Sequence, residues 1–138
     1  MVDVRVNEAN MRAMLQSPAG PVVRTVERYT RRTANVARAT APADTGHLRS
    51  SVTSGVHNRG TSVVGRISSN LDYAIYQEKG TGIYAGNGPI RPKKAKMLAF
   101  RPKGSAKMVF AKQVKGTPAT HFLENALRTS VPWPVHRT

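Results

Sequence analysis

Two prolines bound the most regular segment of this sequence and fix where one helix can begin and end. Pro21 suits the first position of a helix, because the N–H that proline lacks has no partner there. Pro42 disfavours helical geometry at the residue before it, so the helix should end near Thr40. Between the prolines, apolar positions recur at spacings of four, three, four and three: Val22, Val26, Tyr29, Thr33 and Val36. This spacing predicts a long amphipathic helix.

Arginines follow the opposite side of the same helix. The row repeats the apolar spacing two residues later, about 200° away at 100° per residue. Its members are Arg24, Arg28, Arg31, Asn35 and Arg38. Glu27 lies one turn before Arg31 and can pair with it, which adds only about 0.2–0.5 kcal/mol. A charged row is usually a solvated face, but four arginines in register without an acidic row favour a surface that meets negative charge.

Turn signals divide the rest of the chain into short elements. The opening 20 residues predict either a short helix or a loose segment. The stretch 57–60, HNRG, predicts a hairpin, and 70–80 predicts a short helix that ends at Gly80 with Asn70 or Asp72 near its cap.

The C-terminal half is predicted to hold a loop, a second hairpin and a last helix. Glycine, proline and lysine dominate 80–96, which indicates a long loop. Two β-prone runs joined by KGS at 103–105 predict the hairpin. Thr117 and Pro118 should begin the last helix, whose expected apolar face is Phe122, Leu123, Ala126 and Leu127.

This order of elements predicts one α+β domain over residues 1–130. The long N-terminal helix and the C-terminal helix should pack on one face of a small antiparallel β-sheet, with a long basic loop between them. Residues 131–138, VPWPVHRT, cannot continue a helix and should form an extended tail. For a chain of 138 residues, one hydrophobic core is enough.

Charge is the strongest compositional signal. The 22 lysines and arginines against 7 acidic residues give a formal net charge of +15. A compact fold with that charge repels itself unless nucleic acid or an acidic protein surface lies nearby. Contact with DNA or an acidic partner is therefore expected for the four helix arginines and for a cluster in the long loop: Arg91, Lys93, Lys94 and Lys96. The sequence has no zinc-finger, RNA-module or recognition-helix signature, so sequence-specific reading is not expected.

The motifs that resemble catalytic or metal sites are incomplete. DTG at 44–46 is the tripeptide of aspartic proteases, but it occurs once and without apolar flanks, so a capping turn is favoured. His47, His57, His121 and His136 lack metal-site spacing. Asp72 and Glu78 have no candidate nucleophile beside them, and the glycines of GTGIYAGNG lack the Lys-Ser or Lys-Thr of a phosphate loop. We therefore expect no catalytic residues, no metal and no cofactor.

Other partners and chemistries are also disfavoured. The sequence has no cysteine, which excludes disulfides and thiolate metal sites. No run of 18 apolar residues occurs, so no membrane partner is expected.

Three motifs carry a resemblance to a known family. They are PADTGHLRSSV at 42–52, YAIYQEKGT at 73–81 and KGTPATHFLENAL at 115–127. In their order and spacing, these segments resemble the neck or tail-completion proteins of long-tailed bacteriophages, small tail components encoded among head–tail connector genes. The likeness spans about residues 5–130. It departs from the family pattern at Lys79, where the family often has an aromatic residue, and at His121.

The resemblance implies a structural virion protein rather than an enzyme. Such a protein would be assembled in the host cytoplasm into a ring of six copies at the head–tail junction, and genomic DNA would pass through its bore. The implied partners are further copies of the chain, the head-closure or connector protein and the tail terminator or tail tube.

Five residues are expected at a scaffold corner or subunit interface, where the short helix turns into the long loop: Tyr73, Tyr76, Glu78, Gly80 and Thr81. Charge alone leaves an alternative function open. This alternative is a free-standing, sequence-nonspecific nucleic-acid-binding protein of ribosomal or nucleoid type.

Overall fold

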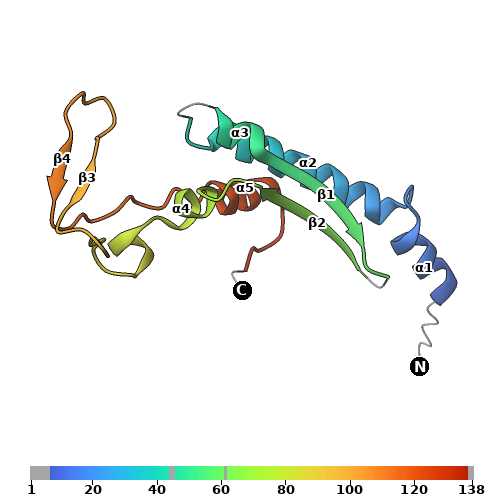
Figure 1. The fold of residues 1–138 in the computed structure, drawn as a ribbon. Coiled ribbons are helices and arrows are strands. Elements are labelled where there is room, and N and C mark those ends of the chain that lie inside the picture. Colours follow the sequence, from blue (N-terminus) through green and yellow to red (C-terminus); the bar gives the residue numbers. More distant parts are fainter. Residues whose placement is uncertain (1–6, 44–45, 61, 137–138) are drawn as a thin grey trace. The chain divides into compact units, whose positions relative to one another are not determined.

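The computed structural model describes residues 7–43, 46–60 and 62–136, which fall into two compact units (Figure 1). Unit 1 comprises Met1–Leu71 and Phe122–Thr138, and unit 2 comprises Asp72–His121. The elements of unit 1 are α1 (Glu8–Gln16), α2 (Pro21–Thr40), α3 (His47–Ser51), β1 (Val52–Asn58), β2 (Val63–Ser69) and α5 (Phe122–Ser130). Those of unit 2 are α4 (Ala74–Lys79), the 3-10 helix η1 (Gly82–Ala85), β3 (Leu98–Phe100) and β4 (Val109–Ala111).

The α+β class is confirmed, with a long helix in the N-terminal half, a small antiparallel sheet and a C-terminal helix. Each sheet has two strands, β1 with β2 and β3 with β4. Within the described ranges, no helix is both long enough and apolar enough to span a membrane.

Helix α2 begins and ends where the two prolines predict. Pro21 is its first residue and Thr40 its last, and the N–H of Ala41 donates to the carbonyl of Ala37 at 2.8 Å. The helix contacts every other element of unit 1: α1, α3, β1, β2 and α5. It is therefore the central support of that unit.

Small residues form the buried face of α2. Thr30, Thr33, Ala34 and Ala37 are buried, whereas most of the predicted apolar row is only half-buried. The hydroxyls of Thr30 and Thr33 donate to carbonyls one turn earlier, at 2.7 and 2.8 Å, so burial leaves neither without a partner. Short side chains on this face let the neighbouring elements approach the helix backbone closely.

The first hairpin forms where HNRG predicts it. Strands β1 and β2 pair in register from Val52 opposite Ser69 to Asn58 opposite Val63. The N–H of Arg59 donates to the carbonyl of Ser62 at 2.8 Å and closes the turn. The expected capping turn at Asp44 and Thr45 precedes this hairpin and lies outside the described residues.

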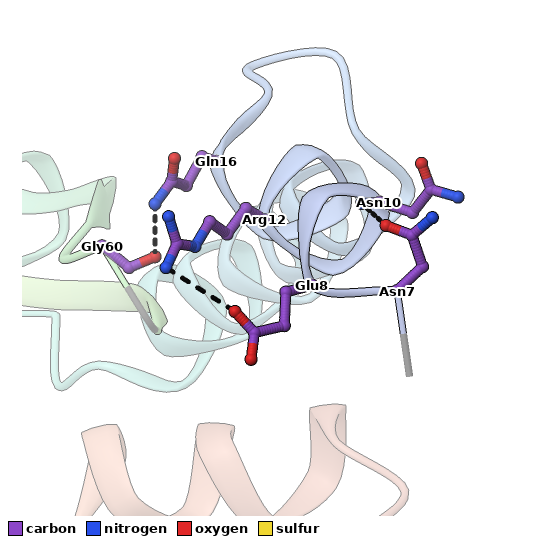
Figure 2. Close-up of polar contacts among 6 residues, drawn as sticks. All are labelled: Asn7, Glu8, Asn10, Arg12, Gln16 and Gly60. Atoms are coloured by element: carbon purple, nitrogen blue, oxygen red, sulfur yellow. Dashed lines mark hydrogen bonds and ion pairs between the residues drawn. The ribbon is translucent and has the colours of Figure 1, made fainter. Parts of the chain in front are cut away.

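Helix α1 is tied to the tip of this hairpin. Asn7 caps the helix, because its side chain accepts from the N–H of Asn10 at 3.1 Å. At the other end of the helix, the side chain of Gln16 donates to the carbonyl of Gly60 at 3.2 Å (Figure 2). The side chain of Asn58 donates to the carbonyl of Leu15 at 2.9 Å. The opening segment is therefore an anchored short helix, one of the two predicted possibilities.

The hairpin approaches α2 closely at Gly65. A Cβ at this position would lie 2.0 Å from Oγ1 of Thr30 and 3.2 Å from Cγ1 of Val26. The Thr30 hydroxyl cannot turn away without losing its bond to the Val26 carbonyl. We expect Gly65→Ala to lower the free energy of unfolding by about 1–3 kcal/mol through overpacking.

The matched control for this prediction is Gly55→Ala on the paired strand. Its nearest non-neighbouring atom would be Nε2 of His57 at 3.6 Å, an ordinary contact. This control should change stability by no more than about 0.5 kcal/mol. Urea unfolding measured on both variants tests the difference, and equal stabilities would show that the hairpin does not rest on α2 at Gly65.

The last helix begins later than predicted. Helix α5 starts at Phe122, and the predicted start at Thr117 and Pro118 is wrong. Instead, residues 117–120 extend alongside 77–81: the carbonyl of Thr117 accepts from the N–H of Thr81 at 2.9 Å, and the N–H of Thr120 donates to the carbonyl of Gln77 at 2.8 Å. The pairing holds 117–120 extended, and it engages the Thr117 carbonyl, which would accept an intrahelical bond if the helix began there.

The buried side of α5 packs along α2. Phe122, Ala126 and Ser130 recur every four residues and are all buried. Of the predicted apolar face, Leu123 is half-buried and Leu127 is exposed. Helix α5 ends at Ser130, as the proline-rich segment after it predicts.

Backbone hydrogen bonds connect distant segments of unit 2. Tyr73 occupies the N-cap position of α4, directly after Asp72, one of the two residues predicted near the cap. Gly80 follows the helix at φ +77°, as predicted. Ile90 pairs with Val114 in an isolated bridge between the long loop and the segment before Gly116.

The second hairpin also forms as predicted. Strands β3 and β4 pair from Leu98 opposite Ala111 to Phe100 opposite Val109. A turn over 102–105 connects toward β4, with the N–H of Ser105 donating to the carbonyl of Pro102 at 3.0 Å.

Candidate interaction surface

The outer side of α2 presents an arginine face to solvent. Arg24, Arg28, Arg31 and Arg32 are all exposed, and together with Glu27, Asn35 and Val36 they line a shallow depression of about 490 Å³. Three of these arginines were predicted from the helical spacing. Arg32 was not, although it follows Arg28 by four residues, and that spacing could have identified it.

Two contacts order parts of the arginine face. Glu27 pairs with Arg31 one turn later, as predicted. Both side chains are substantially exposed, so the pair adds little stability but reduces the charge available at Arg31. The guanidinium carbon of Arg28 lies 5.2 Å from the centroid of the Tyr29 ring, a cation–π contact.

The segment after α5 packs against the same part of α2. Trp133 meets Tyr29 edge to face, with ring centroids 5.0 Å apart and an interplanar angle of 70°. Such an arrangement is favourable because the positive edge of one ring meets the negative face of the other. Trp133 therefore connects the C-terminal segment to the ring on which Arg28 lies.

Arg38 differs from the other predicted arginines. Its Nε and Nη2 donate to the carbonyl of Val52 at 3.2 and 2.7 Å, and its Nη1 donates to Oδ1 of Asn35 at 3.1 Å. The side chain is half-buried and links the last turn of α2 to the start of β1. Three of its donors are thus used within the fold.

The loop cluster in unit 2 is exposed. Arg91, Lys93, Lys94 and Lys96 all face solvent, and Nε of Arg91 donates to Oε1 of Gln113 at 3.2 Å. All the lysines of the chain fall between Lys79 and Lys115, whereas the basic residues of unit 1 are all arginine. Unit 2 carries ten basic and two acidic side chains, a formal charge of +8.

The scaffold corner has two different sides. Tyr73 and Tyr76 are exposed, so their rings are available to a partner. Gly80 and Thr81 lie instead against the segment 115–119, where Oγ1 of Thr81 accepts from the N–H of Thr117 at 2.8 Å. Glu78 is half-buried, and its carbonyl accepts from the N–H of His121 at 3.2 Å.

A second groove lies on the hairpin side of α2. It measures about 420 Å³ and runs between the α1–α2 connection, α2 and β1, with Gln16, Val23, Thr30 and Ser54 among its lining residues. Its lining is mainly small, apolar and amide side chains. No sequence pattern pointed to this groove.

The fold and this surface define a small cationic α+β protein whose central helix displays arginines. Residues 7–80 match the HK97-gp10-like family, which is described as a bacteriophage tail component. The match spans more than half of the sequence, from α1 through α4, and the chain belongs to this family. The resemblance seen in the sequence motifs is thereby confirmed at the level of the family.

A tail component is a virion protein, so the phage and tail assignments follow from the family. Searches of curated proteins and of solved structures found no significant match.

Proposed function

We propose that this protein is a structural connector of the phage neck, assembled as a ring of six copies at the head–tail junction. Its partners would be further copies of itself, the head-closure or connector protein and the tail terminator or tail tube. Membership of the tail-component family over residues 7–80 is the observation that carries this proposal. The role is structural rather than catalytic.

The charge of the chain supports passage of DNA through the ring. Arg24, Arg28 and Arg31 project from one face of a rigid helix, where they can meet phosphates without reading bases. Contacts to a moving duplex should be numerous and individually weak, as exposed charge pairs are. The lysine-rich loop around Lys93 would add contacts to DNA or to acidic neighbouring rings.

Ring formation has a physical consequence for this protein. A cyclic ring joins one face of each copy to a different face of the next. Tyr73 and Tyr76 are exposed aromatic residues suited to one such face. Because each copy carries a formal +15, neighbouring copies repel, so assembly should be weak at low ionic strength and promoted by DNA.

Mass photometry and electron microscopy of the purified chain, with and without a short DNA duplex, test the proposal. We expect small species at low salt and closed rings when duplex or salt is added. A chain that binds duplex but stays a monomer or dimer under all conditions would overturn the connector. That result would favour the free nucleic-acid-binding protein, an alternative that the family match does not support.

A pair of charge variants tests the arginine face when duplex affinity is measured over a series of salt concentrations. Replacing Arg24 and Arg28 with glutamine should lower the slope of log affinity for duplex against log salt by about two. The control, glutamine at Arg59 and Arg66, removes the same charge from exposed positions in the hairpin and should leave the slope nearly unchanged. Equal effects of the two pairs would show that the α2 face is not the DNA contact.

A further inference from the structure

The second hairpin exposes an unusual amount of apolar surface. We call residues 97–112 the hairpin arm, which contains β3, β4 and the turn between them. Its exposed apolar side chains are Met97, Phe100, Met108, Val109 and Phe110, and Phe110 is 62% exposed. Contiguous exposed apolar residues of this kind mark interaction sites on soluble proteins.

Both faces of the arm are apolar. The register places Phe100 opposite Val109 on one face and Ala99 opposite Phe110 on the other. A two-stranded hairpin with no further cover is marginally stable in water, so this one is suited to gain stability from a partner. The arm also lies outside the residues matched by the family.

Charge around the arm restricts the identity of that partner. From Lys79 to Leu123 the sequence holds ten lysines and arginines and no aspartate or glutamate. Within the arm, Arg101, Lys107 and Lys112 are exposed beside the apolar side chains. A partner surface should therefore be acidic around an apolar centre.

Two other occupants fit this surface less well. A second copy of the chain also carries a net positive charge, so it complements the basic residues of the arm less well than an acidic surface does. Duplex DNA would satisfy the lysines, but its phosphates offer no apolar contact to Phe110 and Met108, which would remain in water.

We infer that the hairpin arm is a docking element for an acidic protein surface with an apolar centre, with Phe110 and Met108 as its anchors. Aromatic and methionine side chains are enriched at the centres of interfaces, and basic residues at the rim attract the partner. This inference names a partner class for the tail component, and it holds whether or not the chain forms a ring.

Three labelled probes test the inference by fluorescence anisotropy on the full chain: poly-glutamate, a random copolymer of glutamate and tyrosine of matched charge, and a short DNA duplex. We expect the copolymer to bind about tenfold more tightly than poly-glutamate, because its tyrosines can bury the apolar surface of the arm. Equal affinity for the two polymers would overturn the inference.

Substitution at the anchors locates the site. The double variant Phe110→Ser with Met108→Ser should lose the tenfold preference while keeping the affinity for poly-glutamate and for duplex. The control is Val64→Ser on β2, at a side chain 39% exposed, which should keep the preference. If the double variant also loses affinity for duplex, the occupant of the arm is DNA. If it loses self-association in the absence of any probe, the occupant is a second copy of the chain. Either result would overturn the inference.

A charge variant keeps the test decisive if the anchor variant unfolds. Replacing Lys107 and Lys112 with glutamine should weaken the binding of both polymers and leave their ratio near tenfold. Unchanged affinity for both polymers would show that they bind elsewhere and would overturn the inference.

Discussion

Replacing Phe122 with alanine is expected to lower the free energy of unfolding of unit 1 by about 3–5 kcal/mol. Phe122 is 2% exposed and is the largest of the fully buried side chains. Most of the other buried apolar residues of unit 1 are alanines, among them Ala34, Ala37 and Ala126. Such short side chains cannot extend into the space that the ring leaves, so a cavity should remain between α5 and α2.

The control for this prediction is on the same helix. Leu127 is 38% exposed, so Leu127→Ala should cost less than about 1 kcal/mol. Urea unfolding followed by fluorescence of Trp133 reports on unit 1, because Trp133 is the single tryptophan of the chain and packs on Tyr29. Similar losses for the two variants would show that α5 is not anchored through Phe122.

The elements that the sequence predicts correctly are those with local signals. Helix α2 has both ends fixed by prolines, and its period is regular enough to separate a packed side from an arginine side. The first hairpin depends on a turn in which Asn58 accepts from the N–H of Gly60 at 3.1 Å, a contact two residues apart. Local chemistry is sufficient in both cases.

The errors fall where distant segments compete with a local pattern. Thr117 and Pro118 have the composition of a helix start, yet Thr120 donates its N–H and its hydroxyl to Gln77, 43 residues away. No local pattern can show that the backbone of 117–120 pairs with 77–81. The start of α5 is therefore set by tertiary pairing rather than by propensity.

The candidate site also combines residues that local spacing identifies with contacts that local spacing cannot reveal. Spacing alone places Arg38 in one row with Arg24 and Arg28, and all four arginines of the row do lie on the helix predicted for them. What separates Arg38 is the carbonyl of Val52, 14 residues later, which accepts two of its donors. The sequence identifies the arginines, and only the packing of β1 shows which of them the fold itself uses.

The glycines of the predicted loop also have a role that only contacts with distant segments reveal. They indicate turns in the sequence, but Gly82 is required by a close backbone approach. A Cβ there would lie 2.3 Å from the carbonyl oxygen of Lys115. The same junction also restricts Gly116, where a Cβ would lie equally close to a carbonyl oxygen.

Replacing Gly116 with alanine is expected to destabilise unit 2 by about 3 kcal/mol, which corresponds to a loss of about a hundredfold in hydrogen-exchange protection. Gly116 has φ +94°, and a Cβ would lie 2.3 Å from the carbonyl oxygen of Thr81. The backbone of Thr81 cannot move aside freely, because its N–H donates to the carbonyl of Thr117 at 2.9 Å. The measurement is the hydrogen-exchange protection of the Thr81 and Ile83 amides.

Gly86→Ala is the control. At Gly86 φ is +77° but no atom lies within 4 Å of the added Cβ, so only conformational strain of about 1 kcal/mol is expected. If the two variants lose protection equally, the close contact between 81–82 and 115–117 does not hold unit 2 together.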